Sequence, residues 1–306
     1  MQPGQRRGVE LFEVGPRDGL QMEPEVVPTA VKVALIERLL GAGVRRIEVA
    51  SFVNPKRVPQ MADAEALLQQ LHRPDGVRFT GLVMNRRGLD RALGAGCDEI
   101  GMVVAASDTF NRRNQQVGTD ESIAAWLEIA TAARAAGVRA QVTISTSFGC
   151  PFEGEVPMQR VLDVAQRLVD GEPCELCFAD TIGVGVPAQV SALLARAREL
   201  WPRLPLRCHF HNTRNTGMAN AWAALEAGAS TLDASIGGIG GCPFAPAATG
   251  NIASEDLIYL LERSGVRTGV SLPALIETAR WLQQQLGHGV PGLMTKAGLF
   301  PAPAPA

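Results

Sequence analysis

The chain has 306 residues, of which 46% are hydrophobic and 20% are charged, and its formal net charge is −2. This composition is typical of a folded protein with a real core, and the charge gives no electrostatic reason to expect nucleic acid or an anionic membrane as a partner. No apolar run approaches the roughly 20 residues that a membrane-spanning helix needs. The segment before the first expected strand is too short for a targeting peptide, so we expect a cytoplasmic protein.

One unit recurs along the chain: a short β-forming run, a polar loop and an amphipathic helix. The expected strands are residues 9–14, 44–50, 77–84, 99–105, 138–145, 174–179, 206–211 and 230–236. Helical patterns cover residues 29–40, 120–136, 158–169, 188–200 and 215–227, and glycine-containing turns connect several helices to the next strand. Eight such units in about 250 residues predict a TIM (β/α)8 barrel. A doubly wound sheet would also alternate, but the first loop lacks its glycine-rich dinucleotide turn.

The expected barrel domain covers residues 1–270. Residues 271–306 follow as one additional C-terminal helix, 272–286, and a tail rich in proline and alanine. We expect the helix to pack on the outside or the top of the barrel. The tail should be extended or disordered because of its low complexity.

Two histidines near the end of the seventh expected strand are the strongest sign of chemistry. His209 and His211 are two residues apart, so both rings share one face of the strand and can reach one metal ion. A hydrogen-bonded pair on a loop edge is the alternative. Asp18 and Asn251 could add oxygen ligands, a set that suits Mg²⁺ or Mn²⁺ better than Zn²⁺. A salt bridge for Asp18 and a helix N-cap for Asn251 remain open.

Other candidates also follow expected strands, where the chemistry of such barrels is found. Arg17 is a fixed cation suited to an oxyanion or a substrate carboxylate. Glu48 lies in an otherwise apolar strand, so a structural pair with Arg17 and a catalytic role are both open. Cys242 lies in a loop with four glycines, where a thiol-bearing flap, a phosphate cradle and a buried thiol are the alternatives. Gln21, Ser51 and Asp180 complete the polar strand ends.

Several segments resemble motifs of the 3-hydroxy-3-methylglutaryl-CoA (HMG-CoA) lyase family. They are residues 15–21 (GPRDGLQ), 47–53 (IEVASFV), 55–63 (PKRVPQMAD), 149–154 (GCPFEG), 180–185 (DTIGVG), 240–245 (GGCPFA) and 250–253 (GNIA). The arginine–aspartate motif and the histidine pair are similar to those of the wider DRE-TIM metallolyase superfamily. The cysteine loop is more specific to the lyases.

The resemblance implies a retro-Claisen carbon–carbon lyase that uses Mg²⁺ or Mn²⁺ and cleaves an HMG-CoA-like acyl-CoA to acetyl-CoA and acetoacetate, a step of leucine degradation. It also suggests a homodimer. By matching position, the resemblance implies that the metal ligands are Asp18, His209, His211 and Asn251. It implies that Arg17 stabilises the enolate and that Cys242 is the flap thiol. Glu48 and Asp180 would be the supporting acidic residues. Either Cys242 or His209 would then protonate the enolate.

One departure puts the substrate in doubt. The lyases usually carry an Asp-Thr-Tyr-Gly-Gln run after the histidines, whereas residues 212–216 read NTRNT. Arg214 could clamp a different acyl carboxylate, and with Gln21 and Ser51 it forms the candidate substrate-binding set. A lyase acting on a different 3-hydroxyacyl-CoA is therefore open, as is a Claisen-type synthase, although the cysteine loop argues against the synthase.

Two further classes of protein are weighed against the lyase. A Schiff-base aldolase needs a lysine at the barrel mouth, but the three lysines, Lys32, Lys56 and Lys296, do not fall at expected strand ends. A non-catalytic barrel that binds a metabolite or a protein partner would have no need for Arg17 and the histidine pair together.

Overall fold

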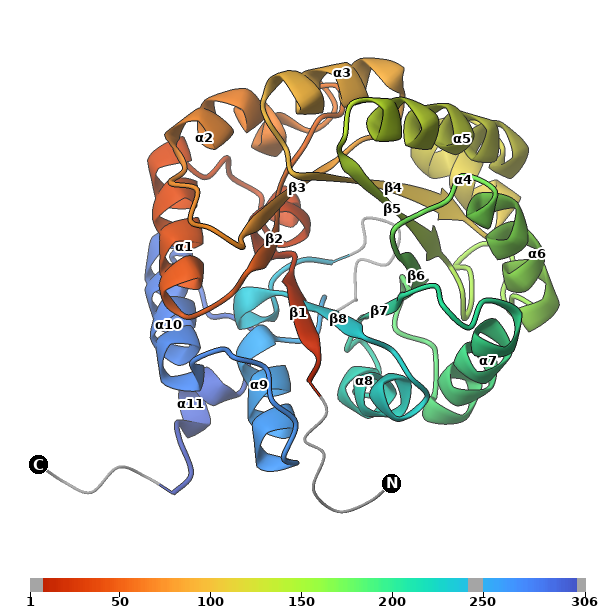
Figure 1. Ribbon diagram of the computed structural model, residues 1–306. Coiled ribbons are helices and arrows are strands. Elements are labelled where there is room, and N and C mark those ends of the chain that lie inside the picture. The colour runs from red at the N-terminus through yellow and green to blue at the C-terminus, as the bar shows by residue number, and fades with distance from the viewer. Residues whose placement is uncertain (1–7, 242–249, 302–306) are drawn as a thin grey trace, which may run out of the picture.

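The structure is a computed structural model that describes residues 8–241 and 250–301. Eight parallel strands close into a barrel in chain order, as Figure 1 shows. The strands are β1 (Glu10–Glu13), β2 (Arg46–Ser51), β3 (Arg78–Leu82), β4 (Glu99–Ala105), β5 (Arg139–Ser145), β6 (Leu176–Asp180), β7 (Leu206–Phe210) and β8 (Thr231–Ala234). Each overlaps the strand expected from the sequence, and the predicted TIM barrel is confirmed.

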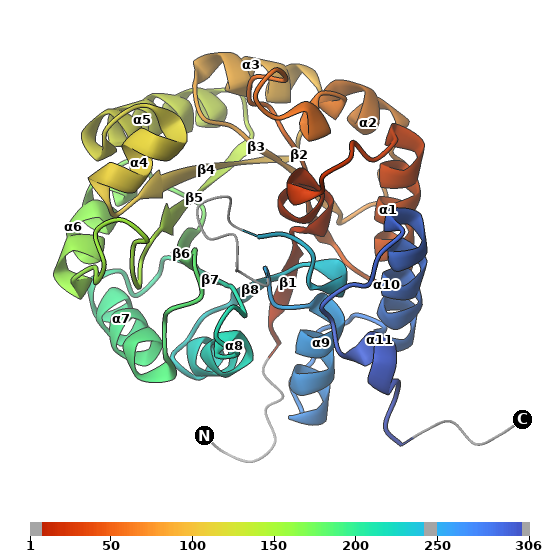
Figure 2. The ribbon, with the colours of Figure 1, turned by 180° about the vertical axis from the view of Figure 1, so that it is seen from behind.

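The helices form a ring around the barrel (Figures 1 and 2). They are α1 (Thr29–Gly41), α2 (Ala64–Gln70), α3 (Arg86–Gly94), α4 (Asp108–Gln115), α5 (Thr119–Ala135), α6 (Met158–Val169), α7 (Pro187–Leu200), α8 (Gly217–Glu226), α9 (Ser254–Arg263), α10 (Leu272–Leu286) and α11 (Met294–Ala297). The main hydrophobic core lies between the strands and this ring. In it, Leu35, Ile36 and Leu39 of α1 are fully buried, as the spacing of apolar residues along this helix predicts.

The additional C-terminal helix, α10, lies outside the barrel beside α1 and α9 in both views of the ribbon. The Ser271 amide donates to the carbonyl of Ala42 at 2.7 Å, which joins the start of α10 to the end of α1. Most of the proline- and alanine-rich tail, residues 302–306, falls outside the described residues. Within the described ranges, no helix is long and apolar enough to cross a membrane.

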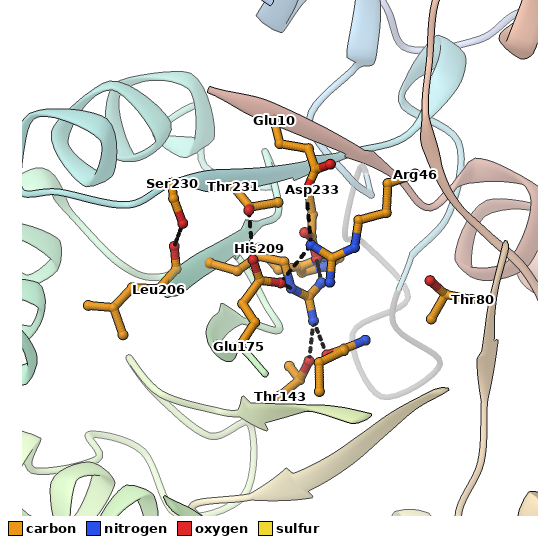
Figure 3. Close-up of polar contacts among 12 residues, drawn as sticks. Glu10, Arg46, Thr80, Thr143, Glu175, Leu206, His209, Ser230, Thr231 and Asp233 are labelled. Carbon is orange, nitrogen blue, oxygen red and sulfur yellow. Dashed lines mark hydrogen bonds and ion pairs between the residues drawn. The ribbon is translucent and has the colours of Figure 1, made fainter. Parts of the chain in front are cut away.

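The interior of the barrel is unusually polar for this fold, in which branched apolar residues usually dominate. Arg46 lies at its centre and pairs with Glu99 at 2.6 Å and with Glu175 at 2.8 Å. Figure 3 shows Arg46 of β2, Glu175 directly before β6 and Asp233 of β8 pointing toward one another. A buried charge must be paired, so these strands are joined by ion pairs as well as by backbone hydrogen bonds.

Candidate active site

The turn after β1 places Arg17 and Asp18 at the mouth of the barrel. Gly15–Gly19 forms a short π-helical turn, in which the amide of Asp18 donates to the carbonyl of Val14 at 2.7 Å. In Figure 2 this dark-red turn lies inside the ring of helices. Arg17 Nη1 lies 2.8 Å from Asp18 Oδ1. The salt bridge that the sequence left open for Asp18 is therefore present.

The two histidines come together as the strand pattern predicts. His209 is in β7 and His211 directly follows that strand, with their ring centroids 5.1 Å apart. Asp18, His209 and His211 each offer one ligand atom, and these atoms all lie within 4.8 Å of one another. Three groups from the ends of β1 and β7 can therefore bind the same ion.

Asn251 lies beside this cluster. It forms an isolated bridge with His211, and its Nδ2 donates to Asp18 Oδ2 at 2.9 Å. Helix α9 begins only at Ser254 with Ala253 at its N-cap position, so the alternative of a helix N-cap for Asn251 is wrong. Because its side chain is held by Asp18, Asn251 faces the histidine pair.

Two buried atoms of this cluster have no protein partner in the described part of the chain. They are Nδ1 of His211 and Oδ1 of Asn251. A buried acceptor without a partner is costly, and a cation would satisfy an imidazole nitrogen and an amide oxygen at once. The donor set, one carboxylate, one amide oxygen and two imidazoles, fits a divalent cation such as Mg²⁺ or Mn²⁺.

The protonation states of His211 and Asp18 favour a cation as well. Burial, together with the neighbouring His209, lowers the pKa of His211 to about 3, so its ring is neutral and free to be a ligand. Burial opposes ionisation of Asp18, but Arg17 and the two histidines lower its pKa below the usual value. Burial also disfavours the imidazolium form of His209, but Asp233 raises its pKa.

Glu48 pairs with Arg17 as one of the two sequence interpretations expects. Its Oε2 accepts from Arg17 Nε at 2.6 Å, and it is 3% exposed. Burial raises the pKa of Glu48, whereas Arg17 opposes this rise. Arg17 is thus held between Glu48 and Asp18, which fixes a positive charge at the edge of the metal cluster.

Ser51 faces the same interior because β2 is irregular. Glu48 pairs with Thr80 and Ser51 pairs with Leu82, with a shift of register between Glu48 and Ala50. In a regular strand, residues three apart point to opposite faces; the irregularity brings Ser51 back to the face of Glu48. Its buried hydroxyl has no hydrogen-bond partner among the described residues.

Asp180 and Arg214 hold loops at the mouth. Asp180 accepts hydrogen bonds from the amides of Val184 at 3.0 Å and Gly185 at 2.9 Å, and burial raises its pKa. Arg214 is exposed, and its Nη1 donates to the carbonyl of Gly183 at 3.0 Å. Both side chains therefore bind the loop after β6.

Gln21 and Cys242 complete the predicted set. Gln21 lies in the short 3-10 turn Leu20–Met22, and its Oε1 is a buried atom that lacks a partner within the described ranges. Cys242 lies outside the described residues, so the thiol of the expected flap is not placed, although the glycines that precede it, Gly237 to Gly241, are described.

Asp233 is a site residue that the sequence reasoning missed. It lies in β8, and its Oδ2 is 3.1 Å from His209 Nδ1 and 2.6 Å from Arg207 Nη1. The signal that could have revealed it is the same as for Glu48, a single carboxylate between the buried apolar residues Leu232 and Ala234. It connects the metal cluster to the charges inside the barrel (Figure 3).

Fold and site together define a TIM-barrel enzyme with a candidate divalent-metal centre at the mouth of its strands. The family model described as HMGL-like matches residues 8–282, and the chain belongs to this family of carbon–carbon lyases. The resemblance seen in the sequence is thereby confirmed.

Relatives in this family are named as lyases of two different acyl-CoA substrates. The chain is 48% identical over 300 residues to an (R)-citramalyl-CoA lyase of Chloroflexus aurantiacus, with 95% of each chain covered. It is 43% identical over 281 residues to a hydroxymethylglutaryl-CoA lyase of Pseudomonas mevalonii, covering 92% of this chain and 93% of the relative. A solved HMG-CoA lyase from Acinetobacter baumannii, in complex with coenzyme A and 3-methylmalate, has a TM-score of 0.93 at 38% identity, and the match covers 100% of both chains.

Proposed function

We propose that the protein is a divalent-metal-dependent lyase that cleaves an HMG-CoA-like acyl-CoA to acetyl-CoA and a keto acid. The observation that carries this proposal is the cluster of Asp18, His209 and His211 beside the orphaned Oδ1 of Asn251. These four residues would hold Mg²⁺ or Mn²⁺. When bound, the cation supplies Lewis-acid polarisation of the substrate's hydroxyl and carbonyl oxygens.

The reaction breaks the bond between C2 and C3 of the acyl chain. The C3 hydroxyl loses its proton, C3 becomes the ketone of the released acid, and the electron pair passes to C2 as a thioester enolate. A proton delivered to C2 completes acetyl-CoA. Arg17, held by Glu48 and Asp18, presents a guanidinium that does not need to reorganise to stabilise the enolate oxygen.

The proton donor to C2 is better assigned to Cys242 than to His209. His209 binds Asp233 through Nδ1, which leaves only Nε2 for the cation, so the ring has no nitrogen left to serve as an acid. Cys242 remains the candidate donor on the basis of its sequence motif. Glu48 and Asp180 act by holding Arg17 and the loop after β6.

Two substrates are to be compared. HMG-CoA is the expectation from the motifs, and (R)-citramalyl-CoA is favoured by the relative at 48% identity. The two acyl groups differ by one methylene between the carbinol carbon and the terminal carboxylate, and their keto acids are acetoacetate and pyruvate. Arg214, together with Gln21 and Ser51, is the proposed substrate-binding set that would sense this carboxylate.

The test is a turnover assay of the purified protein with each acyl-CoA, with Mg²⁺ or Mn²⁺ and then with EDTA. We expect metal-dependent formation of acetyl-CoA together with either pyruvate or acetoacetate. An Arg214→Ala variant should change the ratio of kcat/KM between the two substrates if Arg214 senses the carboxylate. Failure of the folded, metal-loaded protein to cleave either ester would refute the proposal. Sedimentation of the same sample tests the proposed homodimer.

A further inference from the structure

We propose that Asp233 and Arg207 are positioning residues for the metal centre. Asp233 fixes the ring of His209 with Nε2 toward the cation, and Arg207 fixes Asp233. The inference rests on the metal-dependent function proposed above and concerns the affinity of the site for its ion.

The contact between His209 and Asp233 decides which ring nitrogen carries the proton. Asp233 Oδ2 lies 3.1 Å from His209 Nδ1, and Asp233 is 3% exposed. An ionised carboxylate can only accept, so Nδ1 must be the protonated nitrogen. Nε2 then keeps its lone pair for the cation. Partners of this kind orient metal-binding histidines, and removing them typically weakens metal binding about 10- to 100-fold.

Arg207 in turn leaves Asp233 no freedom to rotate away. Its Nη1 donates to Asp233 Oδ2 at 2.6 Å, its Nε lies 3.1 Å from Glu175, and its Nη2 donates to Gln141 and Thr143 at 2.5 and 2.9 Å. These partners come from β5, from Glu175 directly before β6, and from β8, and the Arg207 side chain is 3% exposed. The guanidinium is therefore held by three strands and presents one fixed nitrogen to Asp233.

The barrel also contains a matched arginine that lacks this role. Arg46 and Arg207 lie over the ring of Phe12, at 4.6 and 4.7 Å from its centroid, and both pair with Glu175. The other carboxylate partners of Arg46 are Glu99 and Glu10, near the opposite end of the strands from the metal cluster. Burial and pairing alone thus affect both arginines, whereas the link to His209 involves only Arg207.

The first experiment measures Mn²⁺ affinity of the metal-free protein by titration calorimetry, without any acyl-CoA. Asp233→Ala should weaken binding about 10- to 100-fold. Asp233→Asn should weaken it less, because the amide oxygen can still accept from Nδ1. Glu99→Ala removes a buried carboxylate from Arg46 without touching Arg207, Asp233 or His209, and it should stay within about twofold of wild type. Arg207→Lys should weaken binding more than Arg46→Lys. An Asp233→Ala protein that is folded and binds Mn²⁺ like wild type overturns the proposal.

A second experiment observes the protein with Asp233 unchanged and decides the matter if Asp233→Ala fails to fold. The chain has four histidines, so ¹⁵N-histidine NMR of the Mg²⁺-loaded protein is tractable, with His209 assigned by its absence in His209→Gln. We expect a protonated Nδ1 and an unprotonated Nε2. A proton on Nε2 overturns the proposal.

These readouts separate the inference from the proposed function. If Mn²⁺ binds in the Asp233-dependent way but neither acyl-CoA is cleaved, the positioning role is supported and the lyase proposal fails. If wild-type protein binds no divalent cation, both fail.

Discussion

The buried carboxyl of Glu13 leads to a quantitative prediction about pH and stability. Glu13 ends β1 and is fully buried, and its Oε1 accepts from the amides of Gly15 at 2.7 Å and Ile236 at 2.9 Å. Its Oε2 accepts from the hydroxyl of Ser254 at 2.5 Å. It therefore joins the turn that bears Arg17 to the loop after β8. Burial raises the pKa of Glu13 to about 7, although these three donors oppose the rise.

The free-energy change follows from the two pKa values. The shift from 4.5 to about 7 is about 2.5 units, and at about 1.36 kcal/mol per unit it corresponds to about 3 kcal/mol. Between these pH values the folded state holds one more proton than the unfolded state. Stability therefore falls with rising pH, by about 1.4 kcal/mol per unit. The contribution is fully present below pH 4.5 and is lost as the pH passes 7.

Glu13→Gln should remove this dependence and keep the contacts. The amide oxygen can accept from both backbone donors, and the amide nitrogen can donate to the Ser254 hydroxyl. We expect the free energy of unfolding of wild type, measured relative to Glu13→Gln by urea titration, to fall by about 2.5 kcal/mol between pH 5 and pH 8. Glu226→Gln on the exposed surface controls for the lost charge. Parallel pH profiles for wild type and Glu13→Gln would refute the reasoning, because they would show that the three donors keep Glu13 ionised despite its burial.

Three more predictions follow from single contacts. His211→Ala removes a proposed imidazole ligand and should weaken Mn²⁺ binding, measured by calorimetry, more than about 100-fold, which is more than the loss of a residue that only orients a ligand. Unchanged affinity would exclude the histidine pair as ligands. Lys32 is 1% exposed and pairs at 2.6 Å with Asp63, which is 22% exposed, so Lys32→Met should cost about 1–2 kcal/mol in urea unfolding because the partly buried carboxylate loses its cation; a neutral result would show that water replaces the ammonium group. Trp126→Phe removes the donor to the carbonyl of Leu168 at 2.8 Å and should cost about 1–3 kcal/mol; no loss in thermal unfolding would mean that water replaces the indole.

The architecture could be predicted because each β/α unit has a recognisable local sequence pattern. Turns with glycine, short β-forming runs and amphipathic helices recur along the chain, and eight such units fit one closed barrel. The histidine pair was visible for the same reason, since its geometry depends only on the alternation within one strand. The fold and the convergence of the two histidines were therefore accessible from the order of residues alone.

Partners between strands could not be predicted in this way. His209 and Asp233 are 24 residues apart, and Glu13 and Ser254 are 241 residues apart. In a parallel barrel both faces of each strand are buried, so hydrophobic periodicity does not say which face points inward. Only closure of the barrel, which places β8 beside β1 and β7, shows which charges meet.

Ser51 shows that the alternation of side chains along a strand predicts the wrong face where the strand is irregular. Counting in twos from Glu48 directs Ser51 toward the helices with Val49, where a hydroxyl would meet only apolar neighbours. The shift of register between Glu48 and Ala50 instead turns it to the interior face. An extra residue in a strand locally disrupts the backbone hydrogen-bond ladder. The irregularity turns the buried hydroxyl of Ser51, which has no partner among the described residues, to the same face as Glu48, the partner of Arg17. This position is the reason for including Ser51 in the proposed substrate-binding set.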